Sequence, residues 1–187
     1  MRREKRVAIY GGSFDPPHIG HTAVIEEAFR TLPIDRLILV PTAQSPFKSG
    51  HTAPARTRLA WLEKIAADDP RLEVSDCEIA REGPSYTIDT VHRFAPFFDT
   101  IYLIVGADNL EGLSRWHRFE ELDRMVRWVV ADREGRPIPE GFLRLRIDVP
   151  VSSSELRERM DPSRIPAPIR KEVAAFYAAK PDGYRES

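Results

Sequence analysis

The chain has 187 residues, enough for one domain with a sizeable core, and carries 28 basic and 29 acidic residues. The net charge of -1 argues against a bulk attraction to nucleic acid or an anionic membrane, so any anion must be bound locally. The single cysteine, Cys77, cannot form an internal disulfide, which is typical of a reducing compartment. Four apolar residues after the basic N-terminus are too few for a signal-peptide core, and no stretch is apolar enough to span a bilayer. We expect a soluble, cytoplasmic, single-domain protein over residues 1–187, with flexible ends at 1–5 and 180–187.

The stretch from Gly11 to His21, Gly-Gly-Ser-Phe-Asp-Pro-Pro-His-Ile-Gly-His, joins a predicted strand at 7–10 to a segment whose apolar residues have helical spacing. We expect Gly11 and Gly12 to adopt backbone angles closed to other residues and to let a ligand approach the main chain. We also expect one of the two prolines to open the helix, with Asp15 as its cap. The N–H groups and the dipole at such a helix start favour a phosphate site.

His18 and His21 are three residues apart, so we expect both on one face of the first helical turn, beside this phosphate site. An imidazole can donate a hydrogen bond to a phosphate oxygen and can become charged as negative charge gathers. One alternative is a tight turn followed by two solvated histidines. Another is a zinc site, but no nearby cysteine or carboxylate completes the ligand set. Glycines, prolines and paired histidines together after a strand favour the phosphate site.

Strands and helices alternate along the rest of the chain. We expect strands at 36–40, 72–74, 100–105, 126–131 and 143–147, and helices at 56–67, from Ser85, from Val151 and at 166–178. The most apolar strand, 100–105, is expected near the centre of a parallel sheet. Ligands of such sheets bind beyond the carboxyl ends of the strands.

Three serines, Ser152 to Ser154, open one of these helices, and Arg157 follows within its first turns. A helix cap needs only one serine. The remaining hydroxyls, the N–H groups and the guanidinium are therefore expected to form a second cradle for phosphate oxygens.

The 11–21 stretch resembles the signature of the nucleotidyltransferases with a His-x-Gly-His motif, and among them the nicotinate mononucleotide adenylyltransferases of bacterial NAD synthesis. The 151–157 segment is similar to the Ile-Ser-Ser-Thr-x-Ile-Arg motif of that family. This resemblance implies a Rossmann-like, doubly wound α/β fold, with a mainly parallel sheet and helices on both faces. Class I aminoacyl-tRNA synthetases share His-Ile-Gly-His, but they need a second lysine-rich signature, an anticodon domain and a basic surface.

The resemblance implies direct transfer of AMP from ATP, with Mg²⁺ carried on ATP, to nicotinate mononucleotide. It assigns catalysis to His18, His21 and Lys48. ATP or phosphate binding falls to Gly11, Gly12, Ser13, Phe14, Ser152, Ser153 and Arg157. Nicotinate mononucleotide binding falls to Thr42, Tyr86, Thr87, Asp108, Trp116 and Arg133, with the N–H of Thr87 on the pyridine carboxylate. The chain departs from the family pattern at Thr42, Phe47 and Glu134, where relatives carry asparagine, histidine and part of an Arg-Pro-Gly element.

Ordinary structural roles remain as alternatives for several of these residues. Thr87 and Asp108 could cap helices, Trp116 could be a half-buried packing residue, and Lys48 could be solvated. Two functional alternatives also remain. One is a relative that uses nicotinamide mononucleotide or phosphopantetheine, or a cytidylyltransferase. The other is a nucleotide sensor without catalysis. The expected partners are small molecules, with no nucleic acid or membrane, and the sequence leaves the oligomeric state open.

Overall fold

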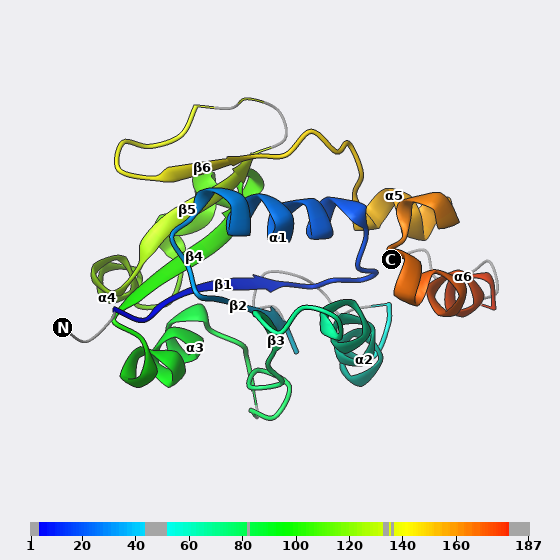
Figure 1. Cartoon of the computed structure of the whole chain (residues 1–187), viewed down its shortest axis with the longest axis horizontal. Coiled ribbons are helices and arrows are strands. Elements are labelled where there is room, and N and C mark those ends of the chain that lie inside the picture. Colours follow the sequence, from blue (N-terminus) through cyan, green and yellow to red (C-terminus); the bar gives the residue numbers. More distant parts are fainter. Residues whose placement is uncertain (1–3, 44–51, 82, 133–134, 136, 180–187) are drawn as a thin grey trace.

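The computed structural model describes residues 4–43, 52–81, 83–132, 135 and 137–179. In this part of the chain, six strands form one parallel sheet in the order β3-β2-β1-β4-β5-β6 (Figure 1). Their bounds are Arg6–Gly12 (β1), Arg36–Pro41 (β2), Leu72–Val74 (β3), Thr100–Gly106 (β4), Arg127–Asp132 (β5) and Leu143–Arg146 (β6). This order is that of the doubly wound Rossmann fold, which confirms the predicted fold class. The strand order reverses between β1 and β4, where such sheets bind their ligands.

Helices cover both faces of the sheet (Figure 1). The α-helices are Ile19–Thr31 (α1), Ala55–Ala66 (α2), Thr87–Phe94 (α3), Phe119–Met125 (α4), Ser153–Glu158 (α5) and Arg170–Ala178 (α6). Short 3₁₀ helices are Ala95–Phe97 (η1), Ala107–Arg115 (η2), Pro162–Arg164 (η3) and Ala167–Ile169 (η4). The predicted terminal helix at 166–178 is thus divided between η4 and α6. Among the described residues, no helix has the length and apolar character needed to cross a membrane.

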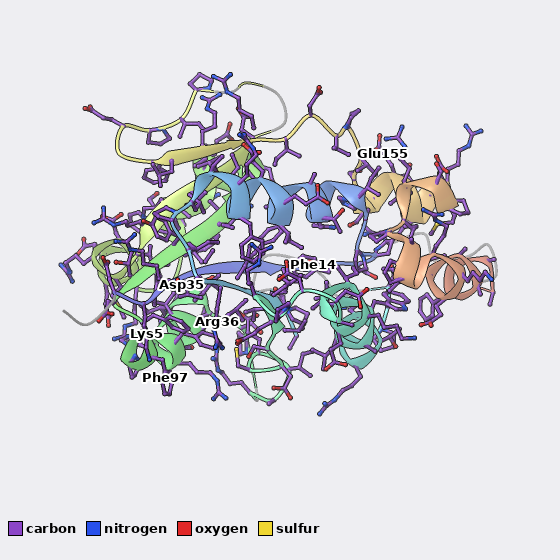
Figure 2. The ribbon with its side chains drawn as sticks, viewed as in Figure 1. Lys5, Phe14, Asp35, Arg36, Phe97 and Glu155 are labelled. Carbon is purple, nitrogen blue, oxygen red and sulfur yellow. The ribbon has the colours of Figure 1, made fainter. Side chains whose placement is uncertain are left out.

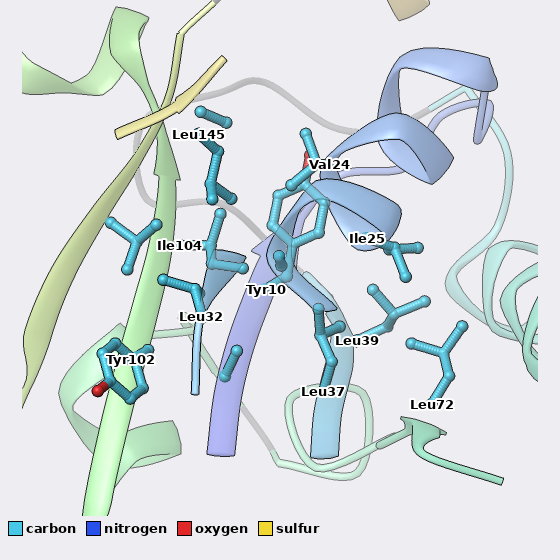
Figure 3. Close-up of a cluster of buried hydrophobic side chains, with 14 of the residues drawn as sticks. Tyr10, Val24, Ile25, Leu32, Leu37, Leu39, Leu72, Tyr102, Ile104 and Leu145 are labelled. Carbon is cyan, nitrogen blue, oxygen red and sulfur yellow. The ribbon is translucent and has the colours of Figure 1, made fainter. Parts of the chain in front are cut away.

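Alternate residues of each strand enter two different cores, because successive side chains of a strand point to opposite faces. On one face, Val24 and Ile25 of α1 pack with Tyr10, Leu39 and Ile104 of the sheet (Figure 3). On the other face, Ile88 and Val91 of α3 and Leu122 of α4 pack with strand residues that include Val7, Ile9 and Leu103. Both faces are covered, which explains why the central strands are apolar throughout.

A third core lies beside the carboxyl end of the sheet and joins α2 to the C-terminal helices. Trp61 of α2 is buried there with Val151, Leu156 of α5, Ile169 and Val173 of α6. Trp61 is therefore a packing residue of this core. Figure 2 shows Phe14, just after β1, and Glu155, on α5, toward the same end of the molecule, with Lys5 toward the other end. The C-terminal segment thus returns to the end of β1 at which ligands of this fold bind.

Candidate active site

The end of β1 leaves the main chain of Gly11 open. Gly11 is exposed although the four preceding residues are buried, and a Cβ placed on it would come no nearer than 3.9 Å to the carbonyl oxygen of Val40. Neither Gly11 nor Gly12 has a positive φ, so the prediction that they need backbone angles closed to other residues is wrong. At Gly12 the reason for glycine is steric, because a Cβ would lie 3.2 Å from the ring of Phe14.

Phe14 itself is buried and adopts a left-handed backbone with φ of 50°. Its ring makes edge contacts with Tyr10 at 5.4 Å and with His21 at 4.9 Å between ring centroids. Because its ring lies in the core, Phe14 could reach a ligand only through its main chain. Its side chain supports one flank of the His21 ring.

Helix α1 begins later than expected, because neither proline opens it and Asp15 does not cap it. His18 is the N-cap, and its Nδ1 accepts a hydrogen bond of 3.1 Å from the N–H of Gly20. The Asp15 carboxylate instead accepts bonds from the main-chain N–H groups of Thr52, at 2.6 Å, and Ala53, at 2.8 Å. The expectation for this helix start was wrong because histidine is not among the residues that commonly cap helices.

The two histidines of the motif form a single stacked unit. The Nδ1 of His21 accepts a 3.1 Å bond from the N–H of His18, and the two rings stack with 3.7 Å between centroids. Since both Nδ1 atoms accept hydrogen bonds, each neutral imidazole must carry its proton on Nε2. The backbone has therefore selected the tautomer in which both Nε2 atoms are hydrogen-bond donors.

The predicted second cradle is docked on the same turn. Ser152 is the N-cap of α5 and shares a capping box with Glu155. Ser153 donates its hydroxyl to the carbonyl oxygen of Pro16 at 2.9 Å, and Nη1 of Arg157 donates to the carbonyl oxygen of Asp15 at 2.7 Å. The two predicted phosphate-binding segments, far apart in sequence, are therefore in direct contact.

Packing reinforces this contact. Gly20, in the first turn of α1, has no room for a side chain, because a Cβ there would lie 2.9 Å from the His18 ring and 3.1 Å from Val151. Val151 immediately precedes the serines of the second cradle. A glycine at position 20 thus lets the His18 ring and the start of α5 come together.

Three of the residues predicted to hold the mononucleotide, Tyr86, Thr87 and Trp116, lie at or beside the start of α3. The rings of Tyr86, before α3, and His117, beside Trp116, lie 4.4 Å apart. Trp116 is half-buried and contacts Trp128 edge-on, with 6.3 Å between ring centroids. The alternative in which Trp116 is a half-buried packing residue therefore agrees with the structure. The N-cap of α3 is Tyr86, which makes no side-chain cap bond, so the alternative in which Thr87 caps the helix is wrong. The N–H groups of Thr87 and the next residues are therefore not capped by that side chain.

Thr42 and Asp108 lie at the ends of β2 and β4. The N–H of Thr42 donates to the carbonyl oxygen of Gly12 at 2.9 Å. This bond joins Thr42 to the turn between β1 and α1, residues 13–18, which we call the signature turn. Asp108 is exposed, and its carboxylate lies only 2.3 Å from where a Cβ on Gly106 would stand. Asp108 does not cap η2, whose N-cap is Gly106. The exposed carboxylate can therefore accept a hydrogen bond from a ligand at this edge of the sheet.

Two charged residues in this region were not singled out from the sequence. Glu78 is buried and accepts a bond of 2.8 Å from the hydroxyl of Thr90. Burial raises the pKa of Glu78, and the bond from Thr90 opposes that rise. Arg58 of α2 is fully buried as well. The local sequence pattern does not indicate that either charged side chain is buried. In α2, the spacing of apolar residues predicts which side faces the core, but it does not predict that Arg58 lies on that side.

A cavity of about 330 Å³ opens at the carboxyl ends of β5 and β6. It is lined by Asp132, Gly135, Arg144, Arg146, Ile147 and Asp148. Asp132 and Arg144 form an ion pair of 2.7 Å at its wall. Two predicted site residues, Lys48 and Arg133, lie outside the described residues, although Arg133 follows Asp132 directly in sequence. No group of three or more metal-ligating His, Cys, Asp or Glu side chains gathers in the described ranges.

Comparisons with known proteins agree with the fold and identify a family. The family model described as cytidylyltransferase-like matches residues 9–159. A protein of Sulfurimonas denitrificans named "Probable nicotinate-nucleotide adenylyltransferase" is 42% identical over 171 residues, covering 91% of this chain and 94% of that protein. A protein of the same name from Nitratiruptor is 38% identical, covering 92% and 98%. The solved structure of Plasmodium falciparum nicotinic acid mononucleotide adenylyltransferase complexed with NaAD has the same fold, with a TM-score of 0.72, 22% identity and coverage of 94% and 97%.

Proposed function

Because this chain belongs to the nicotinate-nucleotide adenylyltransferase family, we propose that it joins the AMP moiety of ATP to nicotinate mononucleotide. The products are nicotinate adenine dinucleotide and pyrophosphate. The observation that carries this proposal is the docking of Ser153 and Arg157 on the carbonyl groups of Pro16 and Asp15, directly before the stacked histidines. That docking brings two sets of anion-binding groups to one end of the sheet.

The reaction is a single in-line displacement without a covalent enzyme intermediate. A phosphate oxygen of nicotinate mononucleotide attacks the α-phosphorus of ATP, and the bond from that phosphorus to the oxygen bridging to the β-phosphate breaks. The electron pair of that bond leaves with pyrophosphate. Such a step depends on positioning and charge stabilisation more than on a nucleophilic side chain.

His18 and His21 are proposed to donate from Nε2 to the α- and β-phosphates, where negative charge grows during transfer. Their tautomer supports this role, because it is held by the hydrogen bonds to Nδ1 before any substrate arrives. Lys48, Ser153 and Arg157 are proposed to bind the leaving pyrophosphate. Mg²⁺ enters as part of the substrate Mg-ATP, with water ligands rather than a cage of protein carboxylates.

The main chain of Gly11 to Phe14 and the hydroxyl of Ser152 are proposed to complete the ATP side. Nicotinate mononucleotide is proposed to bind against Trp116 and Tyr86, with its carboxylate on the N–H of Thr87. Thr42, Asp108 and Arg133 complete this side of the proposal. The ring contact between Tyr86 and His117 supports it, because it brings the start of α3 beside Trp116.

A substrate panel tests the proposal. The protein is incubated with Mg-ATP and, in turn, with nicotinate mononucleotide, nicotinamide mononucleotide, phosphopantetheine and an amino acid, and pyrophosphate release is followed. We expect release with nicotinate mononucleotide alone or far above the other acceptors. Release chiefly with another acceptor would reassign the substrate. ATP binding without release in any arm would indicate a nucleotide sensor.

A further inference from the structure

A fully buried guanidinium lies beneath the signature turn. Arg58 belongs to the helix α2 and has no exposed surface. Its Nε donates to the carbonyl oxygen of Ala53 at 3.0 Å, its Nη1 to that of Ser13 at 2.6 Å and its Nη2 to that of Thr42 at 2.8 Å. One planar group thus holds main-chain carbonyls from three separate segments.

Burial of this charge is unfavourable, so packing alone does not account for it. Burial lowers the pKa of Arg58, but a guanidinium remains protonated inside proteins. The three acceptors are neutral carbonyls, and the nearby Asp15 carboxylate provides the compensating charge. An apolar side chain would fill the same space without the cost of desolvating an ion. An apolar side chain could not, however, provide the rigid, planar set of N–H donors that the guanidinium offers to the three carbonyls.

The segments that Arg58 joins belong to two different parts of the proposed site. Ser13 follows β1 and leads to His18, on the ATP side. Thr42 follows β2, on the mononucleotide side. The N–H of Thr42 also donates to Gly12. Since the attacking and leaving groups must be in line, the spacing between these two strand ends determines how the substrates meet.

Asp15 fixes the same turn from its other side. Besides the N–H groups of Thr52 and Ala53, its carboxylate accepts a bond of 2.5 Å from the hydroxyl of Tyr177 in α6. The Ala53 segment is therefore bound by both charged groups, through its carbonyl to Arg58 and through its N–H to Asp15. This double attachment leaves the turn little freedom to move relative to β2.

We propose that Arg58 is a positioning residue for adenylyl transfer, which sets the distance between the ATP-side turn at Ser13 and the mononucleotide-side strand end at Thr42. The inference rests on the proposed function. Arg58 acts through the main chain and need not touch either substrate. Its loss therefore affects the transfer step more than the binding of each substrate alone.

The test replaces Arg58 with lysine, which keeps the charge but cannot hold three carbonyls with one fork. Arg56→Lys, at an exposed position of the same helix, is the matched control. Binding of nicotinate mononucleotide alone and of a non-reactive ATP analogue alone is measured by calorimetry, and turnover by pyrophosphate release. For Arg58→Lys we expect both affinities to stay close to those of the unmodified protein while kcat falls by about 10- to 100-fold. Arg56→Lys should change neither.

A second variant, Arg58→Gly, leaves a space that methylguanidinium can enter, and added methylguanidinium should restore part of the turnover, whereas urea should not. Unchanged kcat in Arg58→Lys would overturn the inference. So would a loss of both affinities in step with the loss of turnover, or failure of both variants to fold, since each would give Arg58 only a structural role. Absence of dinucleotide formation by the unmodified protein would instead refute the proposed function.

Discussion

The guanidinium of Arg157 donates a hydrogen bond of 2.7 Å to the main-chain carbonyl of Asp15, 142 residues earlier in the chain. Its second nitrogen, Nη2, donates to the hydroxyl of Ser154 at 3.0 Å. Arg157 is nevertheless exposed, and these two bonds use only two of the five N–H donors of its guanidinium. This one side chain both joins the two segments proposed to bind phosphate and keeps donors available to an anion.

Arg157→Ala should therefore change both ATP affinity and stability. We expect the KM for ATP to rise more than the KM for nicotinate mononucleotide, with a loss of about 1 kcal/mol of unfolding free energy from the missing hydrogen bonds. Steady-state kinetics with each substrate varied, together with denaturant unfolding, measure the two effects. Arg159→Ala, at an exposed position just after α5, is the control. An increase confined to the KM for nicotinate mononucleotide would contradict this prediction, because it would assign Arg157 to that substrate and not to ATP.

The capping role of His18 determines how its proposed catalytic role must be tested. His18→Ala removes a helix cap as well as an imidazole, so we expect it to cost about 1 kcal/mol of stability in addition to activity. Asparagine is among the best capping residues. His18→Asn should therefore melt close to the unmodified protein and still lose about 100- to 1000-fold in turnover, since a donor to the developing charge is gone. Turnover that survives in His18→Asn would show that His18 is only a cap.

Gly11 offers a test of ligand binding that can be separated from effects on folding, because an alanine fits at this position. A Cβ at this position meets protein atoms only at 3.9 Å, an ordinary contact, and the backbone needs no positive φ. We expect Gly11→Ala to fold normally and to raise the KM for ATP because the methyl group occupies space proposed for a phosphate. Thermal melting and ATP binding measure the two properties. Normal binding by the alanine variant would remove Gly11 from the phosphate site.

Glu78 should make stability depend on pH in a defined direction. Burial raises its pKa, so the folded state binds a proton more tightly than the unfolded chain does. The stabilising contribution of this proton is fully present below the unfolded pKa and is lost as pH rises through the folded pKa. The stability of the unmodified protein relative to Glu78→Gln should therefore fall as pH rises above the ordinary pKa of a glutamate.

Denaturant unfolding of both proteins at several pH values measures this difference, and Glu26→Gln, at an exposed position of α1, controls for the loss of one negative charge. A difference that stays constant with pH, or grows as pH rises, would contradict the assignment.

The sheet and most helices follow from local pattern. Runs such as 100–105 predict buried strands of a parallel sheet, and β4 indeed lies between β1 and β5. The starts of α1 and α3 were harder, because their N-cap residues are of types that rarely cap helices. His18 acts as a cap through an Nδ1 whose availability depends on its tautomer, and Tyr86 begins α3 without any side-chain bond.

The buried charges could not be predicted at all. An arginine such as Arg58 can occupy any position of a helix, so the sequence does not indicate its role. That role depends on the carbonyl groups of Ser13, Thr42 and Ala53, which only the folded chain brings together. Asp15 was expected to make a local bond and instead binds partners as distant as Tyr177. Local sequence determines which segments form the site, while the positions of those segments depend on long-range polar contacts.

The bond from Tyr177 to Asp15 also has a consequence for the order in which this protein matures on the ribosome. The two residues are 162 positions apart, so at typical elongation rates of about 5 to 20 residues per second they are made roughly 8 to 32 seconds apart. The nascent chain can assemble its first strands long before α6 exists, but Asp15 then lacks its tyrosine partner. Enzymatic competence should consequently appear only after α6 has been synthesised and has packed against the turn at Asp15.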